Sequence, residues 1–188
     1  LYMSKGISLG LFGGGGGCPP LLNVISKDNP GKDTRHCLDR TNKALLRILK
    51  DDSIKEVILT SRGPLYTTGQ GFGNFSGDKY TSWTLHLKDQ EQGLRTNSDV
   101  YEIGLNKTIG ALLKADKKVT FLHDVPELGF NIKRCAITRP VSITSKVMDL
   151  CVLEKEKFIE RNREFRKMTE RVFNRYKEVR VIDLAEAL

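Results

Sequence analysis

The sequence predicts a single α/β domain in which a mostly parallel sheet is covered by helices on both faces, giving three layers. Two observations lead to this prediction. Short apolar or β-branched runs alternate along the chain with longer segments whose apolar residues recur at helical spacing. A chain of 188 residues is also long enough for one ordinary domain of this class and too short for two. We therefore treat residues 1–188 as one domain.

Four runs have the length and composition of strands, at residues 7–12, 55–60, 118–123 and 179–183. Three segments carry an apolar stripe at helical spacing. The first covers residues 38–50, the second begins at a cap formed by Ser98 and Asp99 and ends near Ala115, and the third covers residues 154–176. This order of strands and helices predicts a ligand site beyond the carboxyl ends of the strands.

Two segments lack such patterns. Residues 23–36 are polar and contain an Asn-Pro-Gly turn, so we expect a loop there. Residues 67–96 mix glycines with aromatic residues and predict a long irregular insertion. The aromatic residues, which include Trp83, favour a structured lid, and a mobile excursion is the alternative.

The charge and the two ends of the chain restrict its class. The net charge of +8 would suit an anionic partner such as nucleic acid, but basic and acidic residues are interleaved as on solvated helix faces. No apolar run is long enough to span a membrane, and no signal peptide is evident. Residues 1–6 are typical of the last turn of a helix and residues 183–188 of a helix just beginning, so we expect a fragment truncated at both ends.

The four cysteines form two locally spaced pairs, Cys18 with Cys37 and Cys135 with Cys151. This arrangement favours two loop-closing disulfides and an oxidising compartment, although four cysteines permit three pairings. A zinc site is disfavoured because there is no C-x-x-C motif and no histidine at ligand spacing, and we expect no metal.

Three short motifs match catalytic or nucleotide-binding patterns, but their sequence context does not fit those functions. Gly6, Ser8 and Gly10 fit the nucleophile-elbow pattern, but the serine lies within a predicted strand and not at a strand-to-helix turn. Asp33 and His36 fit D-x-x-H by chance in a polar loop. The glycine run 13–17 precedes Cys-Pro-Pro, and prolines lack the N–H donors that cradle phosphate, so no nucleotide cofactor is expected.

Candidate site residues follow two of the predicted strands. Arg62 and Tyr66 come after the strand at 55–60, where they are expected to bind substrate or to serve as loop caps. His123, Asp124 and Glu127 end the strand at 118–123, and a lone histidine at such a place is more often structural than catalytic.

An ordered series of these features resembles one family. It comprises Gly17-Cys18-Pro19-Pro20, Cys37 before a helix, Arg62 with Tyr66, the Asp124–Glu127 loop, and Cys135 and Cys151 before a charged helix. The series is similar to the SGNH-hydrolase-like, flavodoxin-like domain at the C-terminal side of acyltransferase-3 membrane proteins, which O-acetylate O-antigen (lipopolysaccharide) and related surface glycans. The resemblance extends over nearly the whole chain.

The resemblance implies a periplasmic domain that transfers an acetyl group from a covalently linked membrane acyltransferase domain to a glycan hydroxyl through a serine ester, without a cofactor. The family carries its serine in a G-D-S-H block and its acid and base in a D-x-x-H block. Neither block is found at the corresponding place here, so no catalytic residue is assigned. Gly17 resembles the family's oxyanion donor, and Arg62 and Tyr66 are expected to line the site.

Two alternatives remain open. The first is a non-catalytic module of the same fold that holds polysaccharide. The second is a basic nucleic-acid-binding protein, which the predicted disulfides disfavour because they place the chain outside the cytosol.

Overall fold

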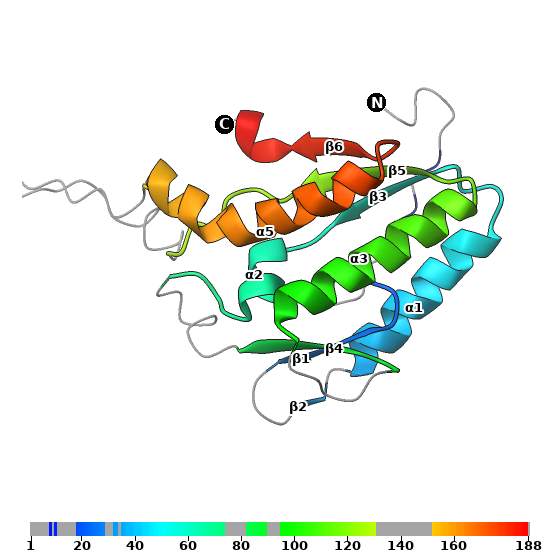
Figure 1. The fold of residues 1–188 in the computed structure, drawn as a ribbon, viewed down its shortest axis with the longest axis horizontal. Coiled ribbons are helices and arrows are strands. Elements are labelled where there is room, and N and C mark those ends of the chain that lie inside the picture. Colours follow the sequence, from blue (N-terminus) through cyan, green and yellow to red (C-terminus); the bar gives the residue numbers. More distant parts are fainter. Residues whose placement is uncertain are drawn as a thin grey trace, which may run out of the picture.

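The computed structural model describes residues 8, 10, 18–28, 32–33, 35–73, 82–89, 95–130 and 152–187. Within these residues the fold contains two three-stranded sheets, with helix α3 (Asn97–Lys114) between them (Figure 1). One sheet is parallel and carries the strands that the sequence predicted. The other is antiparallel and was not predicted.

The parallel sheet has the order β3 (Glu56–Thr60), β5 (Lys118–His123) and β6 (Arg180–Asp183). These strands confirm the runs predicted at 55–60, 118–123 and 179–183. In β3, Val57 and Leu59 are buried whereas Ile58 between them is 54% exposed, so one face of this strand packs into the core. The strand predicted at 7–12 lies outside the described residues.

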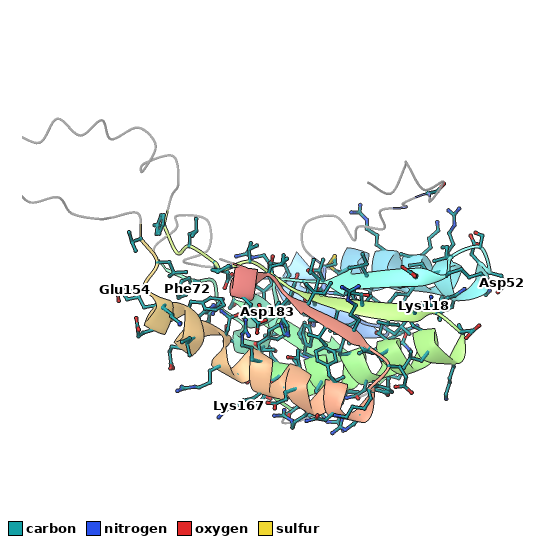
Figure 2. All side chains as sticks on the ribbon, turned by 90° about the horizontal axis from the view of Figure 1, so that it is seen from above. Asp52, Phe72, Lys118, Glu154, Lys167 and Asp183 are labelled. Carbon is teal, nitrogen blue, oxygen red and sulfur yellow. A yellow bond between two sulfur atoms is a disulfide. The ribbon has the colours of Figure 1, made fainter. Side chains whose placement is uncertain are left out.

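Helices α3 and α5 (Lys155–Arg175) lie side by side over the buried face of this sheet (Figures 1 and 2). Both confirm the helices predicted from apolar spacing. The predicted cap of α3 was wrong by two residues, because Thr96 and not Ser98 is the N-cap. Thr96 Oγ1 accepts from the Asp99 N–H at 3.2 Å, and Asp99 Oδ2 accepts from the Thr96 N–H at 3.0 Å, which completes a capping box.

The antiparallel sheet has the order β2 (Lys32–Asp33), β1 (Val24–Asp28) and β4 (Trp83–Leu87). Val24 pairs with Leu87 and Ser26 with Leu85, and all four side chains are buried on one face. The loop expected over 23–36 is therefore wrong for the described part of that segment. The irregular insertion expected over 67–96 is also wrong in part, because it contains β4.

Helix α1 (Arg35–Lys50) confirms the helix predicted at 38–50 and begins three residues earlier. Its first turn is tied to the chain before β1 by the Cys18–Cys37 disulfide, whose Cα atoms lie 5.3 Å apart. This bond confirms one of the two predicted pairs. Cys135 and Cys151 lie outside the described residues, so their pairing stays a prediction.

Candidate site at the carboxyl edge of the parallel sheet

The carboxyl ends of β3, β5 and β6 point toward the same end of the molecule, as parallel strands require. Figure 2 shows Phe72, Glu154 and Asp183 toward this end, and Asp52 and Lys118 toward the opposite one. Short helix α2 (Gly63–Thr68) follows β3 here, and η2 (Leu184–Ala187), a 3₁₀ turn, follows β6. The helix expected to begin at 183–188 is thus a 3₁₀ turn in its described part.

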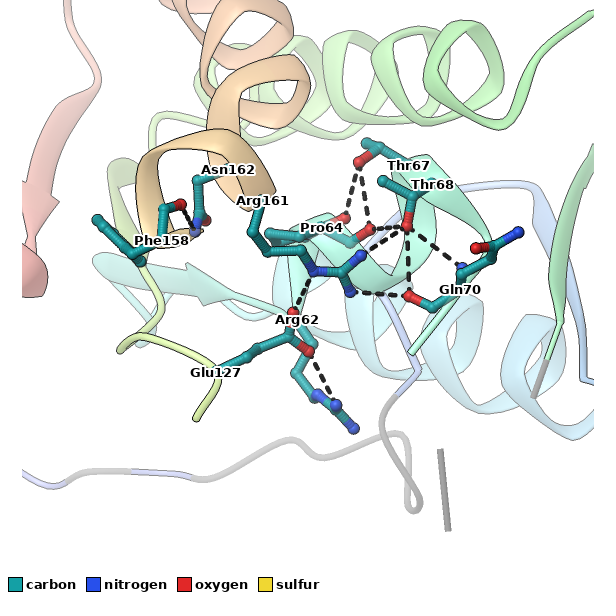
Figure 3. A network of polar contacts seen from close by, with 10 residues as sticks. Arg62, Pro64, Thr67, Thr68, Gln70, Glu127, Phe158, Arg161 and Asn162 are labelled. Carbon is teal, nitrogen blue, oxygen red and sulfur yellow. Dashed lines mark hydrogen bonds and ion pairs between the residues drawn. The ribbon is translucent and has the colours of Figure 1, made fainter. Parts of the chain in front are cut away.

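A network of charged residues joins the segments that follow β3 and β5 to helix α5 (Figure 3). Arg62 donates from Nη2 to Glu127 Oε1 at 2.9 Å, and Arg161 donates from Nε to Glu127 Oε2 at 2.7 Å. The side chains of Glu127 and Arg161 are only 12% and 8% exposed, whereas that of Arg62 is 42% exposed. Arg62 therefore presents part of its guanidinium to the surface while Glu127 holds it in place.

Arg161 also fixes the chain after α2. Its two terminal nitrogens donate to Thr68 Oγ1 at 3.0 Å and to the Gln70 carbonyl at 2.8 Å. Its guanidinium lies over the ring of Phe72, 5.4 Å from the centroid. All three guanidinium nitrogens of Arg161 are thus used, so this side chain is a structural clamp on residues 68–72.

A shallow, open groove lies beside this clamp, between the segment after α2 and the first turns of α5. Its volume of about 630 Å³ is within the range of ligand sites, about 300–1,000 Å³. Four of its lining side chains carry charge and one is aromatic. The lining residues are Thr68, Gln70, Phe72, Glu156, Lys157, Glu160 and Arg161. We call this the Phe72 groove.

A second polar cluster ends β5 and β6. His123 lies opposite Asp183 in the strand register, and Asp183 forms an ion pair with Arg166 of α5 at 2.5 Å. Asp183 Oδ1 also accepts from the Ala185 N–H at 3.0 Å, which anchors η2. Burial alone would raise the pKa of Asp183, but the hydrogen bonds and positive charge around it lower that pKa overall.

The ring of His123 belongs to the core. It is 8% exposed and packs edge-to-face on Phe165 with ring centroids 5.6 Å apart. Burial lowers the pKa of His123, and the charge of Arg166 lowers it further, while Asp183 opposes the change. The imidazole is therefore neutral at pH 7. This environment agrees with the structural interpretation of this histidine.

The other residues predicted for the site fall in different environments. Tyr66 is fully buried, and its ring packs edge-to-face on Trp83 with centroids 5.4 Å apart, so it contributes to the core beneath Arg62. Ser61, at the end of β3, shares a 2.5 Å hydrogen bond with the buried Tyr101 hydroxyl, and burial raises the pKa of Tyr101. Asp124 accepts from the following N–H of Val125 at 2.9 Å. Gly17 lies outside the described residues.

Sequence reasoning missed Arg161, Arg166 and Asp183 as members of these clusters. Arg161 and Arg166 were assigned only to a charged helix. Arg161 does carry a signal, because it lies four residues before Phe165 and seven before Met168, on the buried face of α5. In the described part of the chain, no three His, Cys, Asp or Glu side chains come close enough to hold a metal ion.

The parallel sheet, its covering helices and the polar residues at its carboxyl edge define an α/β domain with its candidate site where such folds bind ligands. A family model for the SGNH domain fused to AT3 (acyltransferase-3) domains matches residues 5–188. The chain belongs to this family. Searches of curated proteins and of solved structures find no match. Within the described ranges, none of the helices combines the length and the hydropathy that a membrane span requires.

Proposed function

We propose that this chain is the periplasmic SGNH domain of a glycan O-acetyltransferase. In this role it receives an acetyl group from a covalently linked membrane acyltransferase domain. It then transfers the group to a hydroxyl of a surface polysaccharide such as O-antigen. The single observation that carries this proposal is the match of nearly the whole chain to SGNH domains that are fused to AT3 domains.

The reaction would proceed through a serine ester. A histidine removes the proton of the serine hydroxyl while the serine oxygen attacks the acetyl carbonyl, and the donor leaves with that proton. The acceptor hydroxyl then attacks the ester, its proton passes to the histidine, and the serine is regenerated. Backbone N–H groups stabilise the negative oxygen of each tetrahedral intermediate. The resemblance puts these residues in blocks that are not among the 188 residues, so none is assigned here.

The contribution of this chain would be a wall of the site. Arg62 stands at the carboxyl end of β3 with its guanidinium held by Glu127 and partly exposed. A fixed cation at this edge can stabilise the developing oxyanion or orient the acceptor. Glu127 and Arg161 are positioning residues, because they act through Arg62 and through residues 68–72.

The test uses the protein with its natural flanking segments, which the resemblance expects to carry the G-D-S-H and D-x-x-H blocks. We expect it to hydrolyse p-nitrophenyl acetate. Arg62→Ala should lower kcat/KM at least about 10-fold, because it removes the contact of the guanidinium with the developing oxyanion or the acceptor. The melting temperature should change little, because the Arg62 side chain is 42% exposed. No hydrolysis by the wild type would refute the enzymatic function, and unchanged kinetics would remove Arg62 from the site.

A non-catalytic module that holds polysaccharide is the second candidate. It is favoured by one observation, which is the open groove lined by Phe72 and by polar and charged side chains. The protein with its natural flanking segments would support this candidate if it bound glycan but neither hydrolysed acetyl esters nor transferred acetyl groups.

A further inference from the structure

We propose that the Phe72 groove binds the acceptor glycan as a neutral oligosaccharide, with one sugar ring packed on the part of the Phe72 ring that faces the groove and its hydroxyls bonded to the charged rim. This inference rests on the proposed function, because it names where the acceptor of that reaction is held. Nothing in the sequence motifs pointed to this groove.

The position of Phe72 is fixed from two sides. Arg161, itself held by Glu127, Thr68 and the Gln70 carbonyl, lies over the ring. The backbone at Gly73 has φ of +74° and approaches the loop after β5 so closely that a Cβ would lie 2.1 Å from the Gly129 carbonyl oxygen. An aromatic ring held in this way is a preorganised platform, and binding to it requires little further ordering.

The rim supplies hydrogen-bonding groups suited to hydroxyls. Glu156 and Glu160 offer carboxylate oxygens that can each accept from two neighbouring hydroxyls, and Lys157 and Gln70 add donors. Among the described residues the partner of the Glu160 carboxylate is Arg163 at 2.7 Å, and the two side chains are 65% and 59% exposed. Exposed pairs contribute about 1 kcal/mol or less, so a sugar can compete for this carboxylate.

The charges favour a neutral ligand. The charged lining residues and their ion-pair partners balance, so neither a polyanion nor a polycation is attracted as a whole. The acidic residues are Glu127, Glu154, Glu156 and Glu160, and the basic ones are Arg62, Lys157, Arg161 and Arg163. The combination of one aromatic ring with several polar groups also disfavours a purely apolar ligand. Because the groove is shallow and open, a polymer can lie along it without an end having to enter.

The groove is connected to the predicted reaction site through shared residues. Arg161 lines the groove and also bonds to Glu127, which bonds to Arg62. A glycan in the groove is thus held beside the carboxyl edge of the parallel sheet, at the same end of the molecule as Asp183 (Figure 2). Placement of the acceptor next to the site is the arrangement that acyl transfer to a sugar requires.

The experiment measures glycan binding directly, by isothermal titration calorimetry or NMR titration of the protein. The probes are neutral oligomers of glucose, of rhamnose and of N-acetylglucosamine, with oligogalacturonate and chitosan oligomers as charged comparators. We expect at least one neutral oligomer to bind more tightly than the charged ones. Phe72→Ala should weaken this binding at least about 10-fold by removing the stacking surface.

Two further variants keep the test decisive. Glu160→Gln should weaken binding about 3- to 10-fold and cannot disturb the core, because its side chain is 65% exposed. Phe158→Ala is the matched control, since Arg166 lies over Phe158 at the same 5.4 Å as Arg161 over Phe72, but Phe158 does not line the groove. This control should change the dissociation constant less than 2-fold.

Each outcome has one meaning. Binding of charged oligomers only, no binding at all, or neutral binding that Phe72→Ala and Glu160→Gln leave intact would overturn the groove assignment. Because the readout is binding and not catalysis, a protein that binds neutral glycan through Phe72 but transfers no acetyl group refutes the proposed enzymatic function alone. If the protein hydrolyses acetyl esters but Phe72→Ala leaves its dissociation constant for glycan unchanged, only the groove assignment is refuted.

Discussion

At the scale of single residues, Glu127 neutralises two guanidinium groups of which one, Arg161, is nearly buried. Glu127→Gln keeps the shape but places an amide against that cation. We expect the free energy of unfolding to fall by about 2–3 kcal/mol, because a buried charge then lacks its partner. Urea denaturation measures this loss. Glu160→Gln, which affects only an exposed pair, should change it by less than about 0.5 kcal/mol, and an equal loss in both variants would contradict the account.

His123 makes stability depend on pH. Since burial lowers its pKa in the folded state, the unfolded chain binds a proton more readily as the pH falls below the ordinary value near 6.5. The stabilisation from the neutral ring is present above that pH and is lost below it. We expect the free energy of unfolding to fall less between pH 7.5 and 5.5 in His123→Phe than in the wild type. Equal falls in the two proteins would show that His123 does not carry this dependence.

Residue patterns alone could identify Arg62, Glu127 and His123 as residues at strand ends, because their positions follow from where apolar runs stop. They could not identify the partners of these residues. Arg161 is separated from Glu127 by 34 residues. Its spacing from Phe165 and Met168 places it on the apolar face of α5, but that spacing does not say which carboxylate it meets. Which helix face packs on the sheet decides this pairing, and that choice is made by tertiary contacts.

At the scale of elements, Gly63 allows α2 to approach α5. A Cβ on Gly63 would lie 2.0 Å from Cζ of Phe165, which is 2% exposed and cannot move freely. Gly63→Ala should therefore lower the free energy of unfolding by about 2–3 kcal/mol through overpacking. Gly110→Ala in α3 is the control, because its Cβ would meet only the Tyr176 hydroxyl at 3.2 Å, and the change should stay within about 1 kcal/mol. Thermal or urea unfolding that ranks the two variants in the opposite order would contradict this packing.

The Cys18–Cys37 disulfide ties α1 to the segment before β1 across a sequence separation of 19 residues. Replacing both cysteines by serine should lower the free energy of unfolding by about 3 kcal/mol, mainly by releasing the unfolded chain. Denaturation of the two proteins under oxidising conditions measures this difference. Peptide mapping without reductant should find this bond and also the predicted Cys135–Cys151 bond, and free thiols at 18 and 37 would contradict the structure.

The elements that could be predicted were those with a local signature. Strands β3 and β5 and helices α1, α3 and α5 each carry their apolar pattern within one segment. Strands β1 and β4 are short, and they pair with each other across a separation of more than 50 residues. Residues 83–87 do alternate apolar and polar side chains, as a half-buried strand does, but this five-residue run was assigned to the irregular insertion.

At the scale of the whole molecule, the alternation of strands and helices was enough to predict an α/β domain with a parallel sheet, and the family match agrees with it. The antiparallel sheet on the far side of α3 was missed, because β1 lacks a regular alternation and its pairing with β4 spans more than 50 residues. The site expected beyond the carboxyl ends of the strands stays a prediction. The groove beside it was not predicted, because it is formed by residues 68–72 and α5, which are distant in sequence.

The proposed function requires that a serine of the full protein carries the acetyl group during its transfer to a glycan. The most direct measurement is mass spectrometry of the protein with its natural flanking segments, quenched in acid after brief exposure to p-nitrophenyl acetate. We expect a peptide acetylated on the serine of a G-D-S-H block, and loss of that adduct when a neutral acceptor oligosaccharide is added. A protein in which no serine becomes acetylated would contradict the claim.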